Sequence, residues 1–402
     1  MDLLRIVIGL VTFYQILSGH AINAISLSKE EDAELQRELQ AINKPAVKTI
    51  TTKHGDIYDC VNIYKQPALD HPLLKNHKVQ MTPSSALLRN LRSSSSNSPS
   101  SVINPVKIGL EIGCPEGTVP IQRTSKEDLI RARYIFRRQH ANDYSIKASE
   151  GYEFAGIFLK PDTNKKYYGV GATLNIYQPP VGSQQISAAM IKLESGGPGN
   201  VGSVQTGWMV NPDLYNDTRT RLFTMWSQVN NGRLSGCYNT YCPGFVVTSF
   251  DYALNAYFNN ISEVNGKQYG YRFSIIQDQS TGNMWLINEE SIKLGYWPKE
   301  LFSNLGNGAD TVFWGGMVYS NLPASPPMGS GLFQNGRYDR TCFMQNVNVI
   351  TVAGAPFTTA DDALVQYKNT RCYNAADYSN VEGWGYRFLF GGEGGDFQHC
   401  LE

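Results

Sequence analysis

The sequence has no net charge and few charged residues. Its 402 residues include 35 Lys and Arg against 35 Asp and Glu, and only 17% of all residues are charged. A protein that binds nucleic acid usually has an excess of basic residues on one face or in one domain. Lys and Arg exceed Asp and Glu by 18 to 13 over residues 22–148, and the order reverses to 16 against 21 from residue 149 onward. This difference is small and screened by salt, so we expect no nucleic-acid partner.

Long apolar runs are absent beyond the first residues. The opening "MDLLRIVIGLVTFYQILSGHA" places one arginine before an apolar run, and Gly19 and Ala21 follow at the spacing of a cleavage site. This pattern predicts a secretory signal peptide over residues 1–21. No later run is long and apolar enough to span a bilayer. We therefore expect an exported protein with no membrane partner.

Metal-ligand spacing is also absent. The chain has seven cysteines, and cysteines of an exported protein are disulfide candidates. Cys237 and Cys242 in "GCYNTYC" are close enough to staple a turn between strands, and no two further ligands stand near them to complete a zinc site. We expect no metal and no other cofactor. Two sequons, at Asn216 and Asn260, predict glycosylation and agree with export.

Helical periodicity is confined to the first part of the chain. Ser28 and Glu31 fit a capping box, and Leu35, Leu39 and Ile42 fall on one face of the helix that follows.

Two more segments complete this N-terminal part. The run "LRSSSSNSPSS", residues 91–101, is of low complexity and predicts a mobile loop or linker. The run "SKEDLIRARYIFRRQH", residues 125–140, predicts a second helix with a basic cluster. Residues 22–148 are therefore predicted to form a small mixed α/β segment.

From about residue 151 the pattern changes to short aromatic and β-branched runs. Eleven such runs, separated by Gly, Asn, Asp and Pro, lie between residues 152 and 392, and "DQSTGN" has the form of a hairpin turn. This pattern of short runs and turn residues is typical of an antiparallel sandwich or barrel. We predict an all-β main domain over residues 149–402.

One of these runs, "FWGGMVYS" at residues 313–320, contains two consecutive glycines. Glycines inside a strand usually indicate that a ligand or another chain approaches the backbone closely. Met317 follows them, and by itself it would be a residue that fills space in the core.

Several longer phrases resemble the neprosin-type proteins of plants. The phrases "HGDIYDCVNIYKQPALDHPLLKNHKVQM" and "CPEGTVPI" resemble their activation segment. The phrases "GWMVNPDLYNDTRTRLFTMW", "SGCYNTYCPGF", "LGYWPKELF" and "FWGGMVY" resemble their main domain. The resemblance runs from about residue 35 to the C-terminus. It implies a protein of the cell wall or apoplast, with an activation segment, a β-sandwich domain and the activity of a glutamic peptidase that cleaves beside proline.

The resemblance also implies a catalytic dyad of two glutamates, and neither is present. One family glutamate precedes the Gly-Trp of "VQTGW" by two residues, where this chain has Gln205; the other follows Trp-Gly-Gly, where it has Met317. Hydrolysis by a carboxyl dyad needs one group to take a proton from water and one to donate a proton to the leaving amine. We therefore predict a catalytically defective member that acts by binding. The expected partners are a proline-rich extracellular or cell-wall protein and the chain's own activation segment, docked on the main domain.

An active endopeptidase that uses a different carboxylate is the alternative. Gln205 can still position a water, and an unrelated glutamic peptidase family works with a Gln–Glu pair. Glu194 in "IKLESG" is the candidate acid, on what would be a neighbouring strand, and Asp213 lies in the loop that follows Gln205. Each also has a structural interpretation, as a strand-end charge and as a turn former.

The resemblance suggests two further sets of residues. Three aromatic residues either line the former cleft or have a structural role: Trp208, Tyr215 and Trp314. The cysteine pairs implied by the family are Cys60–Cys114, Cys237–Cys242 and Cys372–Cys400. Cys342 is then left over and is expected to be buried.

Overall fold

The computed structural model describes most of the chain after the predicted signal peptide. The described residues are 28–95, 103–106, 108–140, 151–159, 161–162, 164–288, 292–333, 336–360, 364–366, 370–396 and 399–400. The predicted signal peptide and the predicted domain boundary at residue 148 lie outside them. No helix in these ranges is both long and apolar enough to cross a bilayer.

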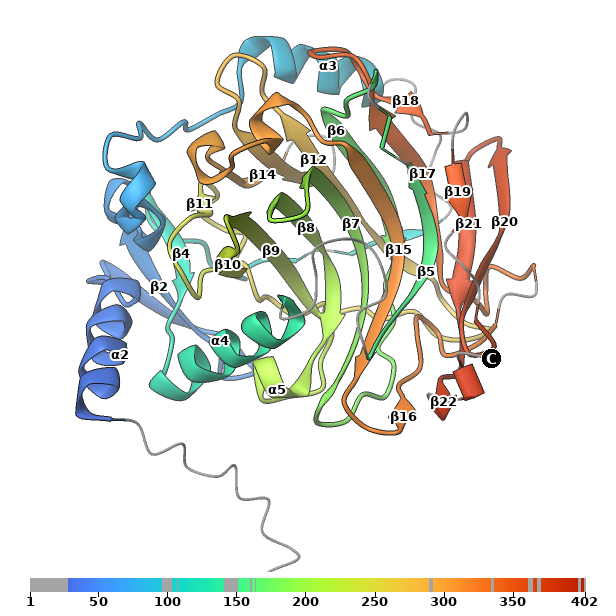
Figure 1. Ribbon diagram of the computed structural model, residues 1–402, viewed down its shortest axis with the longest axis horizontal. Helices are drawn as coiled ribbons and strands as arrows, with labels where there is room; N and C mark the ends of the chain where they lie inside the picture. The colour runs from blue at the N-terminus through green and yellow to red at the C-terminus, as the bar shows by residue number, and fades with distance from the viewer. Residues whose placement is uncertain are drawn as a thin grey trace, which may run out of the picture.

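Two antiparallel sheets stacked face to face form the body of the molecule (Figure 1). The seven-stranded sheet has the order β10 (Arg233–Tyr238), β9 (Arg221–Asn230), β8 (Asn200–Val210), β7 (Gln185–Gly197), β15 (Thr311–Ser320), β5 (Tyr152–Leu159) and β19 (Leu364–Gln366). The main path of the second sheet is β11 (Val246–Val247), β14 (Ile292–Trp297), β13 (Met284–Asn288), β12 (Tyr269–Gln277), β6 (Gly169–Asn175), β17 (Phe343–Ile350), β21 (Gly385–Gly391) and β20 (Asn374–Val381). β18 (Thr358–Thr359) pairs with β17, β3 (Asn104–Pro105) runs parallel to β12, and β16 (Ala324–Ser325) pairs with β22 (Gly395–Asp396). The predicted β-sandwich is confirmed.

The N-terminal segment is of mixed α/β structure, also as predicted. Its three-stranded sheet is β1 (Lys48–Thr51), β2 (Ile57–Asn62) and β4 (Thr118–Gln122), and its helices are α2 (Lys29–Ile42), α3 (Ser85–Ser95) and α4 (Lys126–His140). Short 3₁₀ turns follow β2 at Ile63–Lys65, Pro67–Asp70 and Pro72–Leu74. The predicted capping box begins α2: the Glu31 amide donates to Ser28 Oγ, and the Ser28 amide donates to the Glu31 carboxylate.

The prediction that the serine-rich linker begins at residue 91 is wrong. Residues 91–95 form the last turns of α3, and residues 96–102 lie outside the described part of the chain. α3 exists because Leu87 and Leu91, four residues apart, lie on one face and pack into an apolar cluster with Trp285 and Ile350. Local composition alone missed this contact.

All eleven runs expected to form strands contain one. Seven strands of the main domain lie outside those runs and were missed: β10, β14, β16, β18, β19, β20 and β22. Polar or glycine-containing sequence hides the alternation of β10, β14 and β20, and the other four are only two or three residues long. Between the sheets, side chains at alternate positions of each strand form one continuous core. The N-terminal segment adds seven residues to that core: Val61, Ile63, Leu74, Val106, Ile108, Val119 and Ile121.

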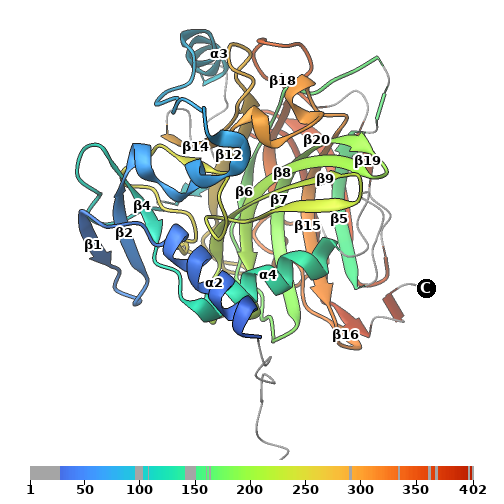
Figure 2. The same ribbon diagram turned by 60° about the vertical axis from the view of Figure 1, so that its left-hand side comes forward.

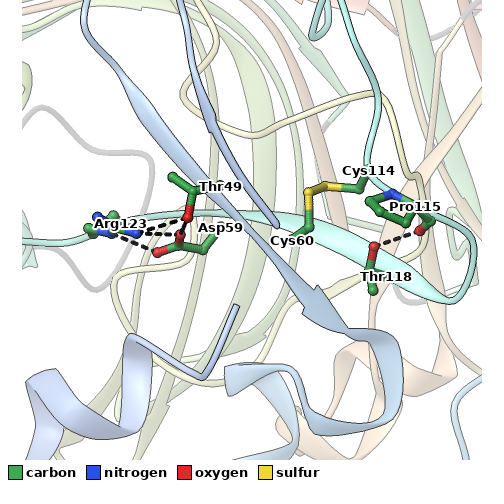
Figure 3. Close-up of a disulfide and its surroundings, with 7 residues drawn as sticks. All are labelled: Thr49, Asp59, Cys60, Cys114, Pro115, Thr118 and Arg123. Carbon is green, nitrogen blue, oxygen red and sulfur yellow. Dashed lines mark hydrogen bonds and ion pairs between the residues drawn. A yellow bond between two sulfur atoms is a disulfide. The ribbon is translucent and has the colours of Figure 1, made fainter. Parts of the chain in front are cut away.

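The three predicted disulfides are confirmed. Cys60–Cys114, Cys237–Cys242 and Cys372–Cys400 have Cα–Cα distances of 5.4, 5.9 and 5.0 Å. Cys342 is a buried free thiol. The first bond joins β2 to the chain that leads into β4, and on the same strands Arg123 donates to both Asp59 oxygens (Figure 3).

The glycine pair of β15 is approached closely by the chain itself. Gly315 lies opposite Gly156 on β5, and a side chain in its place would meet the Phe313 ring. A Cβ at Gly316 would lie 2.5 Å from Met328 Sδ and 2.8 Å from the Phe390 ring. The close approach is therefore made by β5 and the sandwich core, and neither glycine alone indicates a ligand.

Candidate functional site

The seven-stranded sheet is buried on both faces. One face packs on the second sheet, and the other, here called the outer face, carries a separate apolar cluster. An antiparallel sheet often leaves one face to solvent, so this second buried face needs a cover. α4 supplies part of it, because Ala132, Ile135 and Phe136 belong to the same cluster. α4 lies beside α5 (Pro212–Tyr215) in Figure 1 and crosses in front of the strands in Figure 2.

The registers place Gln205 and Met317 on the outer face. Gln205 lies opposite Lys192 on β7, and Met317 lies opposite Ala188 on the same strand. The two positions are thus two strands and four residues apart, or ~10 Å across and ~13 Å along the sheet. Met190 of β7 stands between them.

The floor between these positions is rich in methionine. The outer-face residues of β7, β8, β9 and β15 include Met190, Met209, Met225 and Met317, all buried. The side-chain amide of Gln205 donates to Met225 Sδ at 3.3 Å, a weak acceptor. The two positions that the resemblance assigns to the dyad therefore hold an amide and a thioether, above a floor of buried thioethers.

One acid faces outward on the described strands of this sheet. Glu194 lies on β7 opposite Ser203, diagonally next to Gln205 on the neighbouring strand, as the alternative hypothesis requires. Its Oε2 is 2.6 Å from Lys192 Nζ, and both side chains are 13% exposed. Glu194 is six residues along the sheet from the Met317 position, or ~20 Å, so it can cooperate only with Gln205. Sequence reasoning missed Lys192, although its spacing of two from Glu194 in a strand puts both on one face.

The prediction that Trp208 and Trp314 line a cleft is wrong. Both are fully buried on the opposite face of their strands, inside the sandwich. Their indole N–H groups donate to the Asn175 and Gly171 carbonyls of β6. They lie at even positions, whereas the outer-face residues of the same strands are odd, so alternation forces them inward.

Tyr215 and Asp213 lie on α5 at one end of the outer face. Tyr215 packs against the outer-face cluster, and burial raises the pKa of its hydroxyl above the ordinary range. The Asp213 carboxylate accepts hydrogen bonds from Ser183 Oγ and the Gln184 amide, which hold it at the turn before β7.

A buried arginine of the outer face ties the N-terminal segment to the sheet. Arg221 on β9 is 2% exposed, and its guanidinium contacts Asp56 at 3.0 Å and Asp217 at 2.5 Å. Burial lowers the pKa of Arg221, but the hydrogen bonds and charges of Asp217 and Asp56 outweigh it and raise that pKa. Burial raises the pKa of Asp217, and the hydrogen bonds from Arg221 and Arg219 outweigh it, so this pKa is lowered. Nothing in the local sequence singled out Arg221.

Two further predictions concern metal binding and glycosylation. Within the described ranges, no three His, Cys, Asp or Glu side chains gather where they could hold a metal ion. The two sequon asparagines, Asn216 and Asn260, are exposed, and their glycosylation stays a prediction.

Fold and site together define a class: a β-sandwich protein with an N-terminal mixed α/β segment wrapped onto it. Comparison with known families agrees. A family model described as Neprosin matches residues 183–393, more than half of the chain, and one described as Neprosin activation peptide matches residues 49–160. The chain belongs to the neprosin family.

Solved structures give a more distant similarity. Scytalido-glutamic peptidase with a peptide-based transition-state analogue matches at a TM-score of 0.32 and 12% identity, over 60% of this chain and 98% of that one. SCP-B, a member of the eqolisin family of peptidases in complex with the tripeptide Ala-Ile-His, matches at a TM-score of 0.29 and 11% identity. This match also covers 60% of this chain and 98% of that one. Scores this low carry no argument about the site.

Proposed function

We propose that this chain is a neprosin-family protein that binds polypeptide without hydrolysing it. The observation that supports this most directly is the composition of the outer face. Gln205 and Met317 stand on this face at the positions that the resemblance assigns to the dyad, and Glu194, the one acid on the described strands there, is paired with Lys192. A thioether can neither take nor give a proton, and losing general acid–base catalysis typically costs about 10²–10⁴ in rate.

The proposed ligand class is a proline-rich extracellular protein. The apolar floor supports this choice, because buried methionines and the rings of Phe223 and Phe313 provide an adaptable surface for flat, apolar groups. These floor side chains are buried, in part by α4, so a ligand that reaches them must displace what covers them.

Peptide hydrolysis at acidic pH tests the proposal. The purified chain, intact and after cleavage at an inserted protease site behind Ala148, is incubated with a proline-containing peptide, and new amino termini are measured. We expect no turnover. In the cleaved form, the double variant Gln205→Glu, Met317→Glu should gain acid-optimum cleavage, whereas either single variant should not, because the dyad needs both carboxyl groups.

One observation favours the alternative, an active endopeptidase. Glu194 and Gln205 are diagonal neighbours on adjacent strands of one face, which brings a carboxylate near the amide. Turnover by the parent chain that is lost in Glu194→Gln, and kept in the control Asp213→Asn, would establish this second function and overturn the proposal.

We also propose that the chain is exported and glycosylated. Three disulfides, the leader-like first 21 residues and two exposed sequon asparagines support this. Secreted material should begin near residue 22 by N-terminal sequencing, and it should lose mass on N-glycosidase treatment. Replacement of Asn216 and Asn260 by Gln should abolish that loss, whereas an unchanged loss would mean that the glycans lie elsewhere.

A further inference from the structure

The second sheet has a face that points away from the sandwich core, here called the far face. Strand alternation places the even-numbered residues of β12 on it, because the odd-numbered ones belong to the core. α3 covers one end of the far face, where Leu87 packs with Ile276 and Ile350. At the other end, Ile103 packs with Phe343. The part between these two apolar ends is polar.

Polar side chains of β12, β6 and β17 converge in this middle part. In one row, Ser274 and Asn348 lie on either side of Gly171. In the next row, Arg272 lies beside Thr173. A Cβ at Gly171 would lie 2.5 Å from Asn348 Oδ1 and 3.1 Å from Ser274 Oγ. The polar groups therefore meet above a bare backbone, and a side chain at Gly171 would push them apart.

Most of the hydrogen-bonding capacity of this surface is unused within the chain. Arg272 reaches across β6 and donates to Asn348 Oδ1 and to the Asn346 carbonyl, both at 3.3 Å. Within the described ranges, four side-chain groups make no hydrogen bond and are not enclosed by protein: Asn348 Nδ2, the Asn346 amide, and the hydroxyls of Thr173 and Ser274. Each of these groups can therefore bond to a ligand.

An arginine stacked on two aromatic rings borders the polar part on β21. The Arg387 guanidinium carbon lies 3.9 Å from the centre of the Tyr338 ring and 5.0 Å from that of Trp384. Its Nε is buried without a hydrogen-bond partner. Its two terminal nitrogens are not enclosed, and among the described residues they have neither a hydrogen-bond partner nor an acid within ion-pair distance. We call these three residues the arginine corner.

A β-bulge connects the arginine corner to the polar part. The register of β17 against β6 shifts just before Asn348, and Asn346 in this shift has a positive φ of 51°. The Asn346 amide donates to the Trp384 carbonyl, and the Asn346 carbonyl accepts from Arg272. Bulges of this kind re-aim side chains beside binding sites. The corner and the polar part therefore form one continuous surface.

The chemistry of this surface matches an acidic sugar chain. A guanidinium edge binds a carboxylate through two parallel hydrogen bonds. The half-buried Trp384 ring offers its negative face to the C–H groups of a sugar ring. Hydroxyl and amide groups on three neighbouring strands recur at ~5 Å, about the length of one sugar unit. A nucleic acid would need more cations for its phosphates, and a peptide carries too few hydroxyl groups to use these partners.

We propose that the far face binds a polysaccharide that carries carboxylate groups, with one carboxylate on Arg387 and one sugar ring against Trp384. Hydroxyl groups of the next units then bond to Asn346, Asn348 and Ser274. This surface lies on the other sheet from the proposed polypeptide site, so it is a further function that does not depend on the proposed one. One molecule can then hold polysaccharide on one sheet and polypeptide on the other.

The test uses the full chain and a fluorescently labelled oligogalacturonate, prepared as the free acid and as the methyl ester. Fluorescence anisotropy should show the acid binding about tenfold or more tightly than the ester, the size expected for a charge-assisted hydrogen bond. Arg387→Gln should reduce the affinity for the acid to that for the ester. Arg233→Gln, on an exposed arginine of β10 in the other sheet, is the matched control and should change nothing. Asn348→Ala should weaken binding of acid and ester by the same factor, because it acts on hydroxyl groups.

Three results would overturn the inference: equal binding of acid and ester, equal losses in the two arginine variants, or equally tight binding of an oligoglutamate of the same charge. The last result would show that the far face responds to charge alone. A thermal melt of each variant separates loss of binding from loss of folding. Where Arg387→Gln does not fold, Asn348→Ala decides in its place, and an unchanged affinity in that variant overturns the inference as well.

Discussion

Single residues decide what the outer face can do chemically. Met317 and Gln205 stand on strands whose backbone pairing is regular on both sides, so either side chain can be exchanged for a glutamate without a change in strand pairing. Met190, Met209 and Met225 extend the same apolar chemistry across three further strands. At this scale the family's scaffold and its reaction are separable.

Arg221 is the residue on which we expect the largest single effect on stability. Replacing it by Met leaves Asp56 without its cation and Asp217 with Arg219 alone, which we expect to cost roughly 3 kcal/mol because the Arg221 side chain is buried. Urea unfolding of Arg221→Met measures this. The control is Arg337→Met, whose partner Asp339 is 43% exposed and which should change the free energy of unfolding little. Equal losses in the two variants would show that the Arg221 network does not anchor the segment.

At the scale of single strands and helices, the face on which a side chain lies decides what it contacts. Trp208 lies three residues after Gln205, and Trp314 three residues before Met317. Strand alternation nevertheless places both tryptophans inside the sandwich and places Gln205 and Met317 on the outer face. α4 in turn is buried on two sides, by Leu129 against α2 and by Phe136 against the outer face. Both of these contacts must therefore be given up before α4 can leave the outer face.

The disulfides should differ in how much they stabilise the fold, according to the length of chain that each one closes. Cys60–Cys114 closes a separation of 54 residues and Cys237–Cys242 one of 5. In the chain-entropy model, the first disulfide adds about 4 kcal/mol to the free energy of unfolding and the second adds about 2 kcal/mol. Chemical denaturation of the two double serine variants measures both. A larger loss from the short loop would show that strain or packing, not loop entropy, dominates.

The whole molecule has one core to which both parts contribute. Gln66, fully buried, accepts from the Val247 amide and donates to its carbonyl, and Tyr58 donates to the Leu254 carbonyl. Asp278, in the turn after β12, accepts from Gln80 and from the Ser84 amide ahead of α3. Removing the N-terminal segment would expose core side chains and leave buried polar groups unsatisfied.

The segment should therefore stay bound after the chain is cut. Cleavage at a site inserted behind Ala148 should give two fragments that elute together on gel filtration at pH 7. Burial raises the pKa of Asp278, but hydrogen bonds from Ser84, Ser280 and Gln80 outweigh it, so its folded pKa lies below 3.8. A carboxyl with a lowered folded pKa contributes stability that is present above its unfolded pKa and is lost as the pH falls through the folded value.

Co-elution should accordingly persist at pH 5 and weaken only at a pH below the ordinary pKa of an aspartate, because the pKa values of Asp278 and Asp217 are both lowered in the folded protein. Asp278→Asn removes one titrating anchor, so the cut fragments should separate more readily at pH 7 and depend less on pH in the acid range. Separate elution of the parent fragments at pH 7 would contradict the shared core.

Much of this protein is determined by local pattern. Alternation and turn residues identified eleven strands, the capping box identified the start of α2, and the quoted phrases identified the family and its cysteine pairs. The same phrases located Gln205 and Met317, because a motif fixes positions along the chain.

Only the tertiary structure decided which residues share a space. It placed Lys192 against Glu194, turned Trp208 and Trp314 inward, brought Arg221 to Asp56 across 165 positions of sequence, and set Arg138 over Tyr319. None of these contacts follows from neighbours in the chain, because each depends on how strands far apart in sequence pair and on which face a covering helix packs. The local sequence pattern determines which residues form helices and strands, and long-range packing determines which side chains come into contact.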